Sequence, residues 1–249
     1  MRNLTITICV FLMPILGYAL WSNWDSHQTR VSPDQNLRAI GMALHNYHAA
    51  YKTFPPPNLD GHSWRIRCNP FMISSPLFMH YDFNATWDSV DNRTIHSRPL
   101  RSGKGPHPDE LVICGIPYAF RVNEQMDNHT AFLMVVGDDA FGAVQGRKIT
   151  DVTDPPECTI AVVETARRDI HWLQPMDLDG SELAPTVNDG NTSISSDDPR
   201  GPLVLFVDGA VYRLNPAIDP GTLRALITVN GEEDVSRDRL IASGMLIEP

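Results

Sequence analysis

The chain has 249 residues, of which 42% are hydrophobic and 20% charged, and its formal net charge is −10. This length and composition predict a globular domain with a core of its own. The sequence has no cluster of Lys and Arg to match the concentrated charge of phosphates. We therefore expect no nucleic-acid partner, and we interpret the excess acid as solvated surface charge.

An apolar run without charged side chains occupies residues 4–21 and is long enough to cross a membrane as a helix. Trp21 at its end and Trp24 just after it are placed as expected at a membrane interface. Residues 1–21 are therefore either a single-pass transmembrane anchor, which we favour, or a signal segment cleaved after Ala19. The first interpretation places the protein in the cell membrane with most of the chain extracytoplasmic, and the second makes it secreted or periplasmic.

Residues 22–32 form a polar neck, and residues 33–249 are expected to form a single extracytoplasmic domain. Ser32 and Pro33 are typical of a helix start, and the three prolines at 55–57 end that helix. Apolar residues recur on it at three- and four-residue steps and predict one buried stripe. This stripe consists of Leu37, Ile40, Leu44, Tyr47 and Tyr51.

The rest of the chain is dominated by strand signals and long loops. A pair of apolar runs around Asp208-Gly209 predicts a hairpin. The turn of a hairpin needs a positive φ, which glycine adopts readily. A short helix over 220–229 follows, capped by Asp219, and the polar stretch 176–202 predicts a long surface loop. Further strands are expected at 111–114, 131–136 and 159–164. One long helix followed by mostly antiparallel strands defines an α+β class.

The cysteines of the domain are far apart and contain no C-x-x-C pair, which argues against zinc. They are Cys68, Cys114 and Cys158. One disulfide among them and buried free thiols remain open alternatives.

Two sets of residues are weak candidates for metal ligands. His45 and His48 are three apart on one helix, but packing of the helix surface is the favoured interpretation. Asp177 and Asp179, like the Asp138-Asp139 and Asp197-Asp198 pairs, could offer oxygens to calcium, but the loop that begins at Asp177 lacks the Glu of an EF-hand. We favour solvated loop charges there, and we assign no metal, cofactor or catalytic residue.

Two further groups are expected to lie in the interior. Glu164 ends an apolar strand and is expected to be the one partly buried acid, paired with an arginine such as Arg65 or Arg213. Trp64, Trp87 and Trp172 are expected to pack the core. A lone acid without a second positioned group does not support acid–base catalysis, so we expect no enzyme.

The order of several short motifs resembles a pilin-like family of unknown function that is expanded in planctomycete bacteria. This family, domain of unknown function fifteen fifty-nine, is also labelled solute-binding-protein-like. The motifs are Leu44-His45-Asn46-Tyr47-His48, Phe54-Pro55-Pro56, Ser63-Trp64-Arg65, the His171-Trp172 element with Asp177-Leu178, and the Leu205-Phe206 hairpin with Asp208-Gly209.

The resemblance implies a type IV pilin-like fold, with an N-terminal helix packed on an antiparallel β-sheet with long loops. It also implies a non-catalytic, membrane-anchored, pseudopilin-like structural or interaction protein. Its partners would be the membrane through the N-terminal helix, other pilin-like subunits or cell-envelope components. Residues 1–8 depart from the family because they lack its Gly-Phe and Glu processing motif, which argues against assembly into a fibre. The alternative function is an extracytoplasmic ligand-binding module for glycan, peptide or calcium.

Overall fold

The computed structural model describes residues 32–72, 76–96, 119–122, 125–190 and 192–249. The expected anchor or signal segment, nearly all of the neck and the expected strand at 111–114 lie outside these ranges. None of the described helices is long and apolar enough to cross a membrane.

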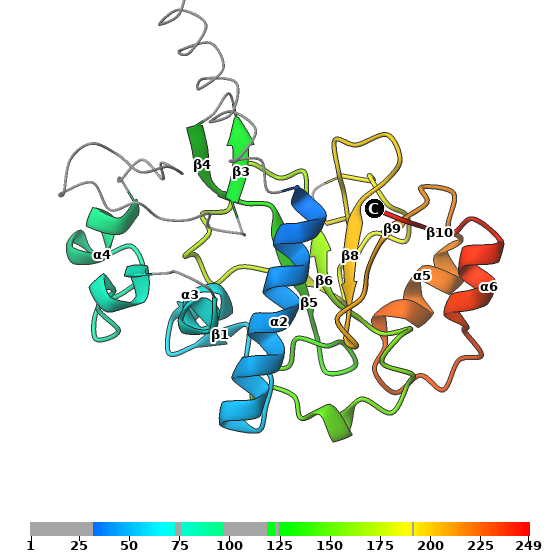
Figure 1. Ribbon diagram of the computed structural model, residues 1–249, viewed down its shortest axis with the longest axis horizontal. Helices are drawn as coiled ribbons and strands as arrows, with labels where there is room; N and C mark the ends of the chain where they lie inside the picture. The colour runs from blue at the N-terminus through cyan, green and yellow to red at the C-terminus, as the bar shows by residue number, and fades with distance from the viewer. Residues whose placement is uncertain (1–31, 73–75, 97–118, 123–124, 191) are drawn as a thin grey trace, which may run out of the picture.

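The domain is built on a six-stranded sheet with the order β10-β9-β8-β6-β5-β7 (Figure 1). Its neighbouring strands are antiparallel, except that β7 runs parallel to β5. Both edges are strands of two residues, which leave little free backbone for unwanted pairing. The strands are β5 (Phe132–Val136), β6 (Ile160–Glu164), β7 (Leu178–Asp179), β8 (Leu203–Phe206), β9 (Val211–Leu214) and β10 (Leu246–Ile247).

Helices cover the sheet on both faces. Helix α2 (Pro33–Tyr51) packs on one face, and α5 (Pro220–Ile227) packs on the other (Figure 1). Successive side chains of a strand point to opposite faces, so Leu205 joins the core under α2 while Phe206 joins the core under α5. The α+β class and the helix-on-sheet packing are confirmed, and the sheet is buried on both faces.

Helix α2 begins where its sequence predicts, but it ends at Tyr51, before the three prolines that were expected to end it. Pro33 is at its first position, although Ser32 makes no side-chain cap bond. At the other end Lys52 adopts a left-handed φ of 66°, and its N–H donates to the His48 carbonyl. Four stripe residues are buried, but Tyr51 is 61% exposed, so its expected burial is wrong. Tyr51 packs edge-on to Phe71 beyond the sheet instead.

Gly41 explains how closely α2 approaches the sheet. A Cβ at this position would lie 2.9 Å from Leu205 Cδ1, closer than side-chain atoms normally approach. The small residue therefore allows the helix to lie directly over β8, as its size suggests.

The predicted hairpin joins β8 to β9 through a three-residue loop rather than a two-residue turn. The Gly209 N–H donates to the Phe206 carbonyl, and the Phe206 N–H donates to the Ala210 carbonyl. Only Gly209 has a positive φ, of 90°. This is the arrangement of a type I turn closed by a left-handed glycine.

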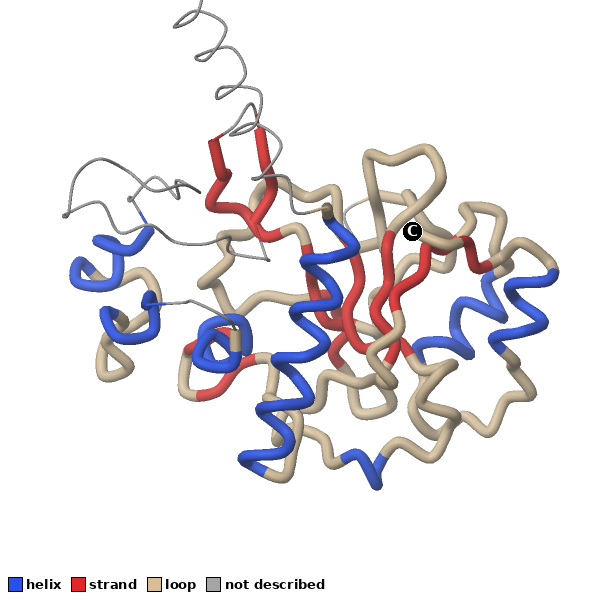
Figure 2. Tube along the Cα trace, viewed as in Figure 1, coloured by secondary structure: helices blue, strands red, loops and turns tan. Residues whose placement is uncertain are grey.

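The remaining elements are short and are separated by long loops (Figure 2). Asp219 caps α5 through the Thr222 N–H, as predicted, but the helix ends at Ile227 rather than at residue 229. The β3–β4 ribbon was not predicted as such. The short elements are β1 (Asn58–Leu59), β2 (His62–Ser63), α3 (Trp64–Cys68), η1 (Asn69–Phe71), η2 (Pro76–His80), α4 (Val90–His96), β3 (Ala119–Val122), β4 (Gln125–Thr130), η3 (Ile149–Asp151) and α6 (Arg237–Ala242).

Candidate functional site

A buried ion pair joins α3 to the loop that leads into β7. Arg65 Nη2 lies 2.7 Å from Asp177 Oδ1, and the two side chains are 0% and 2% exposed. Trp64 Nε1, at 3.1 Å, and the Met134 backbone N–H, at 2.9 Å, donate to the same carboxylate oxygen. One oxygen therefore links α3, the β7 loop and strand β5.

The rest of the Arg65 guanidinium is bonded to oxygens of the same three segments. Its Nε and Nη2 donate to the Phe132 carbonyl at 3.2 and 3.0 Å, and Nη1 donates to Ser63 Oγ at 2.9 Å and to the Gln174 carbonyl at 3.3 Å. A buried charge is tolerable only when it is paired and hydrogen-bonded in this way. The arrangement is that of a structural clamp.

The environment of Asp177 supports the same interpretation. Burial raises the pKa of the Asp177 carboxyl, while the Arg65 guanidinium and the Met134 and Trp64 donors oppose that rise. The prediction of a solvated charge at Asp177 is wrong, because this acid is buried in an ion pair with Arg65. Asp179 is exposed and accepts hydrogen bonds from the Ser181 N–H and hydroxyl at 2.8 and 2.7 Å.

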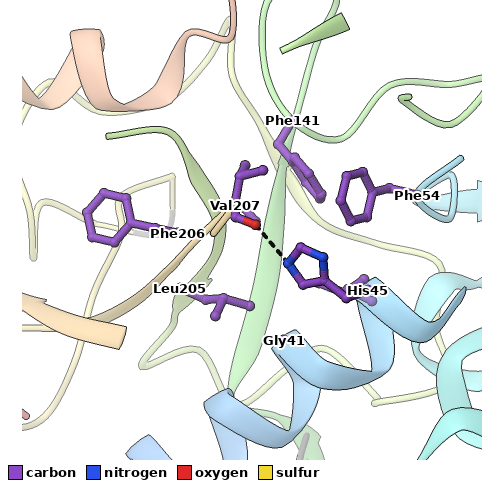
Figure 3. A pocket seen from close by; sticks show the side chains of 9 residues that line it. Gly41, His45, Phe54, Phe141, Leu205, Phe206 and Val207 are labelled. Carbon is purple, nitrogen blue, oxygen red and sulfur yellow. Dashed lines mark hydrogen bonds between the residues drawn. The ribbon is translucent and has the colours of Figure 1, made fainter. Parts of the chain in front are cut away.

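The two candidate histidines of α2 contact different segments, and Figure 3 shows the contact of His45 with Val207. His45 Nε2 donates to the Val207 carbonyl in the β8–β9 turn at 2.8 Å. His48 Nε2 accepts the Ile149 N–H at 3.4 Å, and its ring packs 4.7 Å from that of Phe54. Burial lowers the pKa of His48, and His45 and Lys52 lower it further. The two rings tie α2 to its neighbours.

The hollow beside these histidines is filled by side chains. It has no room for a water molecule. Phe54 and Phe141 face each other across it at a centroid distance of 4.9 Å (Figure 3). Its lining residues are Gly41, Leu44, His45, Phe54, Phe141, Ala161, Leu205, Phe206 and Val207.

A larger cavity of about 300 Å³ lies beside the start of α6. Arg237 on its wall forms a two-point ion pair with Asp208, at 2.7 and 3.0 Å. Cys158 Sγ donates to the Val235 carbonyl at 3.6 Å. Within the described ranges, no group of three His, Cys, Asp or Glu side chains is placed to hold a metal ion, in this cavity or elsewhere. The cavity is lined by Glu157, Cys158, Val235, Ser236, Arg237 and Asp238.

Glu164 is mostly buried, as predicted, and holds the start of β8. Its carboxylate accepts hydrogen bonds from the Leu203 N–H and the Ser196 hydroxyl, both at 2.8 Å. Arg213 is its nearer arginine, at 3.9 Å, whereas Arg65 pairs with Asp177. Burial raises the pKa of Glu164. The expectation that Glu164 is the one buried acid is wrong, because Asp177 is more deeply buried.

The Asp138-Asp139 loop, considered above for calcium, is closed by an arginine. The Arg147 guanidinium donates to the carbonyls of Asp138, Ala140 and Phe141 at 2.9, 2.6 and 3.3 Å. The Asp139 carboxylate pairs with Arg224 on α5. The Arg147 guanidinium therefore lies among these carbonyls, where a bound metal cation would have to lie.

Two of the three domain cysteines are free thiols. Cys68 and Cys158 are both buried and are not bonded to each other, which rules out that disulfide. Burial raises the pKa of each thiol and so disfavours the reactive thiolate. Cys114 lies outside the described residues.

Two polar residues that hold the domain together, Asp154 and Arg147, escaped the sequence prediction, and Asp198 was predicted only as a solvated loop charge. Asp198 bridges Arg200 and Arg213, Asp154 accepts two backbone N–H groups, and Arg147 binds the carbonyls described above. Their partners are distant in the sequence or are backbone groups. Only Arg200, two residues from Asp198, offered a local signal.

The fold and these contacts define an α+β domain whose buried charged groups are bonded internally. Residues 30–114, about a third of the chain, match the family described as "Protein of unknown function (DUF1559)". This match confirms, over that segment, the family resemblance inferred from the motifs. No curated protein and no solved structure matches the chain.

Proposed function

We propose that this chain is a non-catalytic, membrane-anchored extracytoplasmic protein of pseudopilin-like type, with a structural or interaction role. The family match over residues 30–114 supports the class. The order of parts also supports it, since an apolar run at 4–21 precedes a helix that lies along the sheet. Residues 1–21 serve as a single-pass anchor in this proposal.

The observation that carries the proposal is how the chemically capable side chains are bonded. Arg65 and Asp177 bind each other and the backbone, His45 binds a turn carbonyl, and Arg147 binds loop carbonyls. Catalytic groups need to reach a substrate, whereas these groups reach neighbouring segments of their own chain. Such bonding stabilises a rigid domain that presents its surface to partners.

Membrane fractionation of the full chain, combined with N-terminal sequencing, tests the anchor. We expect the protein in the membrane pellet, released by detergent but not by salt, with its N-terminus at Met1 or Arg2. A soluble protein that begins at Leu20 would contradict the anchor and would favour a secreted module instead.

The second candidate function is ligand binding, and the cavity of about 300 Å³ beside α6 is the observation that favours it. Thermal unfolding of the purified protein with calcium, glycans and peptides tests this function. A ligand-dependent rise in melting temperature that is lost in Ser236→Trp, which fills the cavity, would support it. No rise across the panel would count against it and in favour of the structural role.

A further inference from the structure

The segment that follows α5 contains a reactive dipeptide. Asn230-Gly231 is the only Asn-Gly pair in the sequence. Asn230 is exposed, and its side chain forms no hydrogen bond with the residues that the structure describes. Asn-Gly pairs are the most prone to cyclise, because glycine places no side chain in the way of attack by its own nitrogen. The geometry around this pair decides whether it can react.

The backbone on both sides of Asn230 is held by one short segment. The Val229 carbonyl accepts the N–H groups of Thr153 and Asp154 at 2.8 and 3.0 Å. The Asp154 carboxylate in turn accepts the N–H groups of Gly231 and Glu232 at 2.8 and 2.9 Å. Glu232 has a left-handed φ of 58°, which lets the two N–H groups converge on this one anion.

This contact places a base on the nitrogen that would react. Asp154 is 7% exposed and its Oδ2 lies 2.8 Å from the Gly231 nitrogen. The hydrogen bond from the Gly231 N–H lies in the plane of its peptide group, whereas the nitrogen attacks Asn230 Cγ from a face of that plane. Asp154 can therefore receive the proton without obstructing the approach of the Asn230 side chain.

We propose that Asn230-Gly231 is a site of self-modification, in which Asn230 is converted through a succinimide to aspartate and isoaspartate. The Gly231 nitrogen forms a bond to Asn230 Cγ and gives up its proton to Asp154. The bond from Cγ to Nδ2 breaks, and ammonia leaves with that proton. Solvent water then opens the ring at either carbonyl, which yields aspartate or isoaspartate.

The products change the charge and the length of the backbone at this point. Each adds a negative charge beside the acidic run Glu232-Glu233-Asp234. Isoaspartate also adds a methylene to the main chain between Val229 and Gly231, both of which are bonded to residues 153–154. The bonds at Val229 and those at Gly231 cannot both persist unchanged. The segment that leads to α6 and β10 is therefore held less firmly after the modification.

Peptide mapping by mass spectrometry, after incubation of the folded full chain in mildly alkaline buffer, tests the proposal. We expect conversion at Asn230 with a mixture of isoaspartate and aspartate, faster in the folded chain than in the same chain in denaturant. Asp154→Asn is expected to slow it by roughly tenfold or more. Gly231→Ala is expected to slow it as well, and Asn230→Gln to abolish it over the same period.

Two results would overturn the proposal. One is a folded chain that keeps Asn230 intact while the denatured chain converts, because Asp154 would then protect the peptide. The other is a folded Asp154→Asn variant that converts as fast as the original chain. If the Asp154→Asn variant does not fold, the rates of Asn230 conversion in the folded and the denatured original chain are sufficient to test the proposal.

Discussion

Arg65 Nη2 and Asp177 Oδ1 lie 2.7 Å apart in the interior, although 112 positions separate the two residues in the sequence. The pair connects α3 to the loop before β7, and both side chains also bond to strand β5. A charge that is buried in this way depends on its partner, because removal of one leaves the other uncompensated. This pair therefore dominates the mutational behaviour that we expect of the domain.

Asp177→Asn should destabilise the protein strongly. The amide keeps the size of the carboxyl but leaves the Arg65 guanidinium without its counter-ion, so we expect a loss of about 3 kcal/mol in the free energy of unfolding. Asp179→Asn is the matched control, since that side chain is exposed, and its effect should stay within about 0.5 kcal/mol. Chemical denaturation measures the free energy of unfolding of both variants. Equal values for the two would contradict a stabilising role for the Arg65–Asp177 pair.

Gly41→Ala should destabilise the protein, although alanine favours helices. The added Cβ would lie 2.9 Å from Leu205 Cδ1 in a packed core. Overpacking costs about 1–3 kcal/mol, whereas the gain in helix propensity is about 1 kcal/mol, so we expect a net loss of about 1 kcal/mol.

Leu205→Val removes the methyl group that the new Cβ would meet. Adding Gly41→Ala to a Leu205→Val background should therefore cost little or stabilise, and thermal melts of the four proteins compare the backgrounds. A Gly41→Ala variant with a raised melting temperature in the original background would show that α2 does not need this close approach.

Arg147→Lys should weaken the loop that carries Asp138 and Asp139. Lysine is a point charge and cannot reproduce the fork that reaches three carbonyls, so buried acceptors lose their donors. We expect a loss of about 2 kcal/mol in the free energy of unfolding. Arg239→Lys, in an exposed ion pair with Asp234, is the control and should change stability little. Equal effects of the two variants would argue against the carbonyl cage.

Stability should fall in acid partly because of Asp198. Hydrogen bonds from Arg200 lower the pKa of Asp198 to about 2, with a further contribution from Arg213. A lowered carboxyl pKa gives stability that is present above the unfolded pKa of about 3.9 and is lost as the pH falls through the folded value. The free energy of unfolding of Asp198→Asn should therefore depend less on pH between about 4 and 2. A pH dependence identical to that of the original chain would contradict this role.

The local parts of the fold could be predicted from the sequence because their signals are local. Proline at the start of α2 and the periodic apolar residues to Tyr47 define the helix, and Asp208-Gly209 defines the hairpin. The exposure of Tyr51 could not be predicted, since periodicity does not show where the sheet beneath a helix ends. The length of the hairpin loop could not be predicted either, because a single glycine is compatible with both a two-residue and a three-residue loop.

The site was less predictable because its contacts are distant. Asp177 sits in a polar loop sequence, and only the fold brings Arg65 and Trp64 to it. Glu164 could be predicted to be buried, because it ends an apolar strand, but the choice between Arg213 and Arg65 depended on tertiary structure. His45 and His48 could be placed on one helix, yet their backbone partners come from other segments.

The central claim is that the buried charges of this domain hold its segments together. A double-mutant cycle with Arg65→Met and Asp177→Leu tests it most directly, with the free energy of unfolding as the readout. We predict that each single variant loses about 3–5 kcal/mol and that the double variant recovers a large part, because no lone charge remains buried. Single losses that simply add in the double variant would contradict the clamp and, with it, this account of the domain.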